Sequence, residues 1–142
     1  GLSASITPKF STSNILINVN LYVGADQTNA SGYQQSYFIY KNGSELDEVN
    51  GDEEGGRQGV AGAINMYDPG GANQTMYQIA RLGGTHMDYA VGATSAQTYS
   101  VRTRSYTSGP TIYINRSQTF QVQGTNYDHV PQSTITLTEI AA

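Results

Sequence analysis

The chain has 142 residues, of which 37% are hydrophobic and 13% charged, with a net charge of −4 and no cysteine. This length fits one domain over residues 1–142, and the small number of basic residues excludes an ordinary nucleic-acid binder. The lack of cysteine excludes disulfides and thiolate metal sites, and the lack of an apolar run of about 18 residues excludes a membrane-inserted helix.

The clearest predicted strand runs over residues 14–23. Its odd-numbered positions are all Ile, Val or Leu, whereas Asn14, Asn18 and Asn20 occupy the other face. Alternation with a period of two is typical of a half-buried strand. Leu16 and Tyr22 fall on the polar face, where they either contact a neighbouring subunit or are simply exposed.

Two hairpins are predicted next along the chain. Residues 35–41 and 44–48 flank Asn42-Gly43, a pair that favours a type I′ turn because both positions need a positive φ. Residues 49–59 are predicted to form an exposed loop, and residues 60–67 a strand that ends at the turn sequence 68–71. Segments 75–82 and 86–91 flank Gly83-Gly84 and predict the second hairpin.

The remaining strand candidates are short. They lie at residues 97–106, 111–115, 120–123 and 133–140. In the last of these, the threonines are expected to point outward and Ile135 and Leu137 inward. No segment keeps an apolar stripe at helical spacing, so we expect little or no helix.

This pattern predicts an all-β domain. About eight to ten short strands with turn signals between them are typical of an antiparallel β-sandwich or jelly roll. A parallel α/β architecture is excluded because it needs crossover helices.

Three segments resemble predicted bacteriophage virion proteins, a family common in marine and cyanobacterial phages. Residues 3–17 (SASITPKFSTSNILI) resemble the opening "ITPKSSSSKILV" of that family, residues 111–117 (TIYINRS) resemble its "TVYINRS" strand, and residues 133–142 (STITLTEIAA) resemble its closing "STITAMEIA" strand. The order and spacing of the three segments match, whereas 47–56 and 59–84 match no known segment.

The resemblance implies a C-terminal domain of a tail-fibre, tail-tip or head-fibre protein on the exterior of the virion. Such domains are expected to be compact sandwiches, broadly like the tumour-necrosis-factor or C1q fold and often homotrimeric. The family supplies no catalytic residues or cofactors to carry over, so we expect a non-enzymatic domain without a cofactor.

The trimer implied by the resemblance has candidate interface residues in this chain. The last strand ends on the small apolar sequence Ile140-Ala141-Ala142, which would fray in a monomer and could be buried on a three-fold axis. An ordinary edge strand with a flexible end is the alternative. The candidate interface consists of Leu16, Tyr22, Glu139 and Ile140.

The receptor of such a domain would be a glycan or a protein of the host surface. Tyrosine rings stack on sugars, and amide and hydroxyl groups hydrogen-bond to sugar hydroxyls, a chemistry that antibody paratopes also use. Three polar segments, 27–35, 65–77 and 124–132, carry candidate contact residues: Tyr33, Tyr67, Asn73, Asn126, Tyr127, Asp128 and His129. The alternative is that the tyrosines are strand residues and the loops are solvated.

Other chemistries have weaker support. Asp47, Asp52, Glu53 and Glu54 lie in a glycine-rich loop that could bind Ca²⁺, although the EF-hand spacing is absent and a solvated loop is the simpler explanation. His86 and His129 lack metal-binding spacing. A glycan depolymerase would need two carboxylates flanking a cleft, and no spacing singles out such a pair. A receptor-binding module, a structural decoration or trimerisation domain, and a depolymerase therefore remain as hypotheses, in that order.

Overall fold

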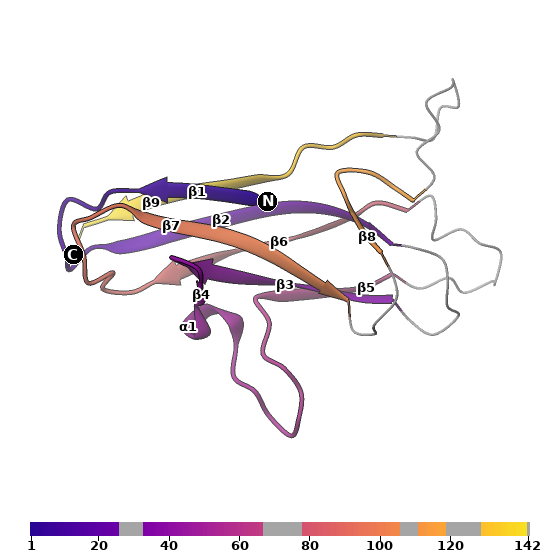
Figure 1. Cartoon of the computed structure of the whole chain (residues 1–142), viewed down its shortest axis with the longest axis horizontal. Coiled ribbons are helices and arrows are strands. Elements are labelled where there is room, and N and C mark those ends of the chain that lie inside the picture. Colours follow the sequence, from indigo (N-terminus) through magenta and orange to yellow (C-terminus); the bar gives the residue numbers. More distant parts are fainter. Residues whose placement is uncertain (26–32, 67–77, 106–110, 119–128, 142) are drawn as a thin grey trace.

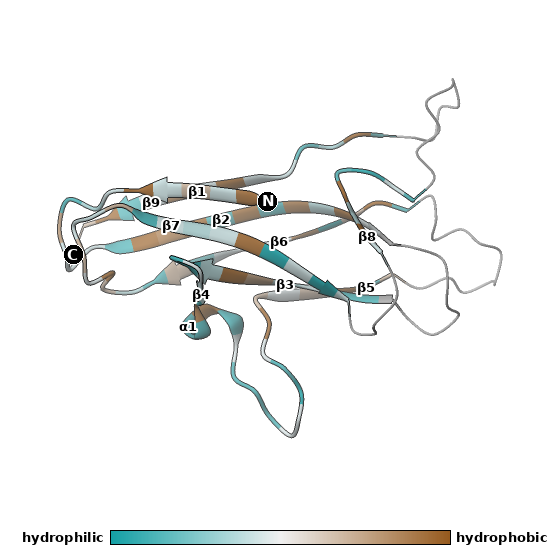
Figure 2. Cartoon of the chain, in the orientation of Figure 1, coloured by the Kyte–Doolittle hydropathy of each residue, from teal (hydrophilic) through white to brown (hydrophobic). Residues whose placement is uncertain are grey.

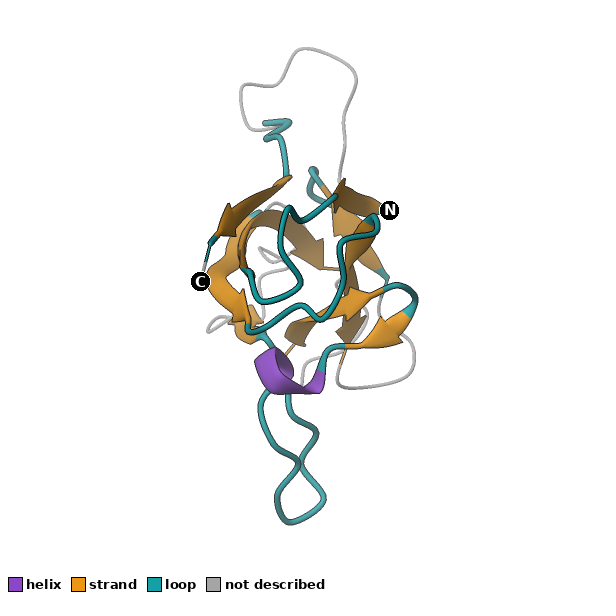
Figure 3. Cartoon of the chain, turned by 90° about the vertical axis from the view of Figure 1, so that its left-hand side faces the viewer, coloured by secondary structure: helices purple, strands orange, loops and turns teal. Residues whose placement is uncertain are grey.

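The computed structural model describes residues 1–25, 33–66, 78–105, 111–118 and 129–141. These residues form two antiparallel sheets that pack face to face, with the long axis of the molecule along the strands (Figure 1). Viewed from one end, the strands of the two sheets surround a common interior (Figure 3). The predicted all-β sandwich is confirmed.

Each sheet is built around one long central strand. In sheet A the order is β1, β7, β3, and both β4 and β5 pair with the free side of β3. In sheet B the order is β6, β2, and both β8 and β9 pair with the free side of β2. The strands of sheet A are β1 (Leu2–Ile6), β3 (Tyr33–Lys41), β4 (Ser44–Glu45), β5 (Gly62–Met66) and β7 (Gln97–Ser105). The strands of sheet B are β2 (Asn14–Ala25), β6 (Ala80–Asp88), β8 (Ile112–Ile114) and β9 (Thr134–Ile140).

The core lies between the two sheets. The inward face of β2 is at most 2% exposed at every odd position from Ile15 to Val23, as the alternation predicts. It packs with Tyr37 and Ile39 of β3 and with Tyr99 of β7, all of which are fully buried. Figure 2 shows hydrophobic stretches along β2, β3 and β7 and mostly hydrophilic residues in the loop that follows α1.

The hairpin at Asn42-Gly43 is confirmed, because both residues have a positive φ, 52° and 89°. Its second strand is shorter than predicted, since β4 ends at Glu45 and residues 47–50 form a one-turn helix, α1 (Asp47–Asn50). The helix turns Asn50 back onto β3 between β4 and β5. There the Ile39 N–H donates to Asn50 Oδ1 (2.9 Å), and Asn50 Nδ2 donates to the Ile39 carbonyl (3.0 Å). The side chain therefore completes the edge of β3 where neither strand reaches it.

The predicted turn at Gly83-Gly84 is wrong. β6 runs without a break from Ala80 to Asp88 and pairs with β2 along its whole length. The glycines allow close packing rather than a reversal of the chain, because a Cβ on Gly83 would lie 2.2 Å from the Val19 carbonyl oxygen. On Gly84, a Cβ would lie 3.0 Å from the Tyr37 hydroxyl and 3.1 Å from His86 Nε2.

The other predicted strands have mixed outcomes. β5, β7 and β8 fall within their predicted segments, and β9 alternates with its threonines exposed and Ile135 and Leu137 half-buried. β1 was not predicted from the sequence; it pairs with β7. The predicted turn 68–71 and strand 120–123 lie outside the described residues. Within the described ranges, the structure contains no helix long and apolar enough to cross a membrane.

Candidate functional site

Six strand ends lie together at one end of the sandwich. The register pairs Tyr33 with Met66, and it pairs Val23 and Ala25 of β2 with Ala80 and Ile112. Gln35 of β3 pairs with Ser105, the last residue of β7. The ends of β2, β5 and β7 and the starts of β3, β6 and β8 are therefore neighbours, at the right-hand end in Figure 1.

Two of the predicted contact segments, 27–35 and 65–77, connect strand ends of this group, whereas 124–132 leads to β9, whose first residue pairs with Asn20 of β2. Tyr33 is the first residue of β3, and His129 is exposed in the segment that leads to β9. Tyr67, Asn73, Asn126, Tyr127 and Asp128 lie outside the described residues. The structure thus brings the anchor points of the first two segments together.

The candidate interface residues divide between the two faces of sheet B. The register pairs Leu16 with Thr138 and Asn14 with Ile140, so Leu16 and Ile140 share the outer face with Tyr22. Leu16 and Tyr22 are half-buried and Ile140 is 38% exposed. Glu139 does not join them, because it lies on the opposite face of β9.

Glu139 instead holds the turn between β1 and β2. Its Oε1 accepts hydrogen bonds from the backbone N–H of Lys9 (2.7 Å) and of Phe10 (3.4 Å) and from the Ser13 hydroxyl (2.7 Å). The hydrogen bond from Ser13, followed by those from Lys9 and Phe10, lowers the pKa of Glu139 despite the opposing effect of burial. An ionised carboxylate is thus the form that the turn favours.

The acidic candidates lie at the base and along one side of a projecting loop, residues 51–60. Asp47, Asp52 and Glu53 line a small pocket together with Glu45, whereas Glu54 lies at the tip of the loop. The described part of the chain contains no group of three or more His, Cys, Asp or Glu residues placed to hold a metal ion. The cation site stays a prediction without geometric support.

The same loop is folded as a tight hairpin at its tip. Glu54 and Arg57 pair through two backbone hydrogen bonds of 3.1 and 2.9 Å, and Gly55 and Gly56 both have positive φ, 58° and 78°. This is the conformation of a two-residue hairpin turn, in which glycine has no steric cost. The turn fixes the backbone position of Arg57 beside the outer face of sheet A.

Basic and aromatic side chains alternate on the outer face of sheet A. Arg102 and Arg104 of β7 reach diagonally across to β3, so that the Arg102 guanidinium lies 3.8 Å from the ring centroid of Tyr40. The Arg104 guanidinium lies 5.5 Å from the ring centroid of Phe38. These are cation–π distances, and they hold both guanidinium groups against the sheet.

Arg104 also forms one wall of a groove between sheet A and loop 51–60. The groove has a volume of about 640 Å³ and is lined by Gln34, Ser36, Gly56, Arg57, Gln58, Val60, Ala63 and Arg104. Arg104 Nη1 donates to Gln58 Oε1, which ties the loop to the sheet. We call this space the basic groove, because Arg57 and Arg104 are its charged residues.

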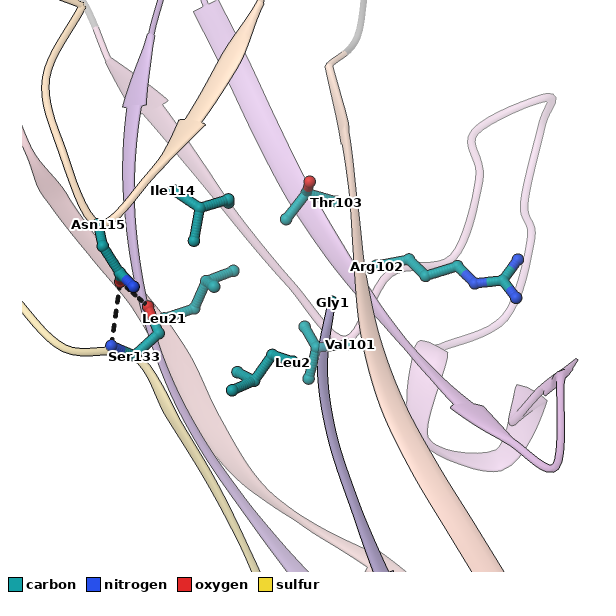
Figure 4. A pocket seen from close by; sticks show the side chains of 9 residues that line it. All are labelled: Gly1, Leu2, Leu21, Val101, Arg102, Thr103, Ile114, Asn115 and Ser133. Atoms are coloured by element: carbon teal, nitrogen blue, oxygen red, sulfur yellow. Dashed lines mark hydrogen bonds between the residues drawn. The ribbon is translucent and has the colours of Figure 1, made fainter.

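A second, mainly apolar cavity of about 690 Å³ opens between the sheets, beside the start of β1 (Figure 4). Leu2, Leu21, Val101 and Ile114 surround it, while Arg102 points away. At its edge Asn115 Oδ1 accepts hydrogen bonds from the Ser133 N–H (3.0 Å) and hydroxyl (2.5 Å). These bonds close the gap between β8 and β9 along β2.

Three polar contacts cross between the sheets in the interior. Lys41 Nζ lies 2.8 Å from Asp88 Oδ2, which also accepts a hydrogen bond from the Tyr99 hydroxyl. The Tyr37 hydroxyl and His86 Nε2 are hydrogen-bonded at 2.7 Å. Burial raises the pKa of Tyr37 to about 12 and lowers the pKa of His86. These contacts lie in the packed interior, so they stabilise the sandwich rather than form an open site.

The chain matches no protein-family model, no curated protein and no solved structure.

The sequence reasoning missed the arginines of the basic groove. Arg102 and Arg104 lie two residues apart in a segment that was predicted to be a strand, so their position on one face could have been inferred. Phe38 and Tyr40 alternate in the same way. The sequence does not reveal that β7 pairs with β3. It also does not reveal the fold of loop 51–60, which brings Arg57 beside Arg104.

Proposed function

We propose that this chain is a domain of the outer surface of a bacteriophage particle, the head of a tail fibre or tail tip. In this proposal it forms a homotrimer and attaches to a glycan or protein of the host surface. The sandwich would then be of the jelly-roll type found in tumour-necrosis-factor and C1q domains.

The observation that carries the proposal is the contact among the three segments that resemble phage virion proteins. Glu139 of the third segment accepts hydrogen bonds from Lys9, Phe10 and Ser13 of the first. Ser133 of the third segment is bonded to Asn115 of the second. All three lie along β2, so the resembling residues form one connected unit, with most of it in sheet B and β1 in sheet A, rather than scattered matches. This supports reading them as a single inherited structural element.

The arrangement of the strand ends supports a role in attachment. A rigid sandwich that displays several loops at one end is a common way to build a binding surface. Here the polar segments with Tyr33 and Asn73 connect neighbouring strand ends. Their composition favours contacts with sugars or with a protein surface.

The outer face of sheet B supports self-association. It carries Leu16, Tyr22, Met87 and Ile140 among asparagine and threonine residues, and Leu16 pairs with Met87 in the register between β2 and β6. Apolar side chains on a solvent-facing sheet face contribute hydrophobic stabilisation when a partner subunit removes them from water. A trimer through this face would also cover Ile140.

Light scattering and adsorption competition on one purified sample test the proposal. We expect the mass of a trimer at micromolar concentration and a dose-dependent block of phage adsorption by excess domain. A trimer without any block of adsorption would indicate the structural alternative, a decoration or trimerisation domain. A monomer that also leaves adsorption unchanged would overturn the proposal.

A further inference from the structure

We propose that the basic groove binds an acidic saccharide, and that Arg57 and Arg104 hold the carboxylate or sulfate of one sugar residue. The inference deepens the proposed attachment function, on which it rests, by naming the ligand class and a site away from the loop end. The site lies between the outer face of β3, β5 and β7 and the tip of loop 51–60.

The charge of the groove is the first argument. The chain has seven basic residues and a net charge of −4, yet three of the seven, Arg57, Arg102 and Arg104, lie along this one surface. In the described part of the chain, none of these three guanidinium groups is paired with a carboxylate. Arg104 uses one donor for Gln58, and a guanidinium has five donors in a planar fork that matches a carboxylate or sulfate. The groove thus offers unused charged donors to an anion.

The neutral side chains of the groove fit the rest of a sugar. Gln34 is exposed, and Gln58 has its amide nitrogen left to donate after its oxygen accepts from Arg104. Amide groups recognise the hydroxyls of a sugar as both donors and acceptors. The volume, about 640 Å³, lies in the range of small-ligand sites. An anion alone would leave most of this space empty, whereas one or two sugar rings would fill it.

The groove is held in place before a ligand arrives. The ring of Phe38, only 4% exposed, packs beneath the Arg104 guanidinium, and Ser36 Oγ donates to the Arg104 carbonyl (3.2 Å). The contact with Gln58 fixes the loop against the sheet. Side chains that are already ordered lose less conformational entropy on binding, so this wall of the groove is suited to direct contact.

Three of the four acidic candidates face a different space, whereas Glu54 lies at the loop tip, where its backbone pairs with that of Arg57. Asp47, Asp52 and Glu53 line the small pocket beside α1, and Gln58 is the residue that lines both this pocket and the basic groove. The loop therefore places the carboxylates of Asp47, Asp52 and Glu53 outside the basic groove. Because exposed charges are screened over about 8 Å at physiological salt, an anion in the groove interacts mainly with Arg57 and Arg104. A long polyanion that crossed the loop would be repelled.

Calorimetric titration of the intact chain with three oligosaccharides of equal length tests the inference: an oligohexuronate, a sulfated oligosaccharide and a neutral oligohexose. We expect an acidic sugar to bind, the neutral sugar to bind at least tenfold more weakly, and affinity to fall as salt rises. The two acidic probes distinguish a carboxylate from a sulfate ligand.

Three variants locate the site. Arg57→Ala removes an exposed side chain from the loop, and Arg104→Lys keeps the charge but loses the planar fork. Each is expected to weaken binding about tenfold, the usual effect of losing a hydrogen bond between charged groups. Lys9→Ala is the matched control; it removes the same charge from an exposed position in the turn between β1 and β2, which does not line the groove, and is expected to bind as the parent does.

The outcomes separate this inference from the proposed function. Equal binding of acidic and neutral sugars, no binding of either, or unchanged binding by Arg57→Ala and Arg104→Lys would overturn the acidic-saccharide site. Binding to host cells is measured in parallel. If cells are bound but the groove variants behave as the parent does, the attachment function stands and the site lies elsewhere.

Discussion

The Tyr99 hydroxyl on sheet A donates a 2.5 Å hydrogen bond to Asp88 Oδ2 on sheet B. Both side chains are fully buried, at 0% and 1% exposure. Lys41 supplies the opposite charge to Asp88 and also donates to the Val91 carbonyl at 3.2 Å. Burial, together with the hydrogen bond and negative charge of Asp88, raises the pKa of Tyr99, which keeps its hydroxyl protonated as a donor.

Tyr99→Phe should therefore destabilise the sandwich. The substitution preserves the ring in the core but removes one donor from a buried carboxylate, which costs about 2 kcal/mol. Urea unfolding followed by circular dichroism measures the free energy of unfolding. The control is Tyr89→Phe, because Tyr89 is 66% exposed and its hydroxyl should contribute little. Equal stability of the two variants would show that the Tyr99–Asp88 contact does not join the sheets.

Glu139→Gln should make stability less dependent on pH. Hydrogen bonds from Ser13, Lys9 and Phe10 lower the pKa of Glu139 in the folded chain, so its ionised form stabilises the fold above the pKa of the unfolded chain. That stabilisation is lost as the pH falls through the lower folded value. The variant should be less stable than the parent at pH 7, and the difference should vanish at acidic pH. Unfolding curves from pH 7 to pH 2.5 test this, with Glu53→Gln as a charge-matched control that should show no such convergence.

Asn50→Ala should loosen the edge of β3. The change leaves the N–H of Ile39, a fully buried residue, without its partner Oδ1, and an unsatisfied buried donor costs about 2 kcal/mol. Amide hydrogen exchange should accelerate at Ile39 before the centre of β7 is affected. Asn18→Ala, on the exposed face of β2, is the control and should leave exchange at Ile39 unchanged.

Gly83→Ala should be more harmful than Gly84→Ala. The added methyl at position 83 meets the backbone oxygen of Val19 at 2.2 Å, which only a backbone shift can relieve. At position 84 the nearest atoms belong to the side chains of Tyr37 and His86, which have more freedom to move. We expect a loss of about 2 kcal/mol for the first variant and a smaller loss for the second. The reverse order in chemical denaturation would contradict the close packing of β6 on β2.

Neutralising the acidic side of loop 51–60 should strengthen the binding of an acidic saccharide. Asp52→Asn combined with Glu53→Gln removes two negative charges near the basic groove without altering its lining. The gain should be a few-fold at low salt and should shrink at high salt, because the effect is long-range and screened. Weaker binding by this variant would show that the carboxylates contact the ligand instead of repelling it.

Much of the fold follows from local patterns. The alternation from Ile15 to Val23 predicts the face of β2 that is buried, and Asn42-Gly43 predicts the hairpin, because a period of two and a positive φ are local properties of the chain. Gly83-Gly84 carries the same signal as a turn but serves close packing. The contact with Val19 that requires glycine comes from a strand more than sixty positions earlier in the chain, which no local pattern reveals.

The candidate site also depends partly on local sequence patterns and partly on tertiary contacts. The sequence by itself determines the alternation that places Arg102 and Arg104 on one face of a strand, and it predicts an exposed loop over residues 49–59. Only the tertiary structure decides that β7 lies beside β3, that Phe38 and Tyr40 support the guanidinium groups, and that Arg57 faces the same groove. Strand order and loop packing depend on contacts between distant residues, whose energies no short window of sequence contains.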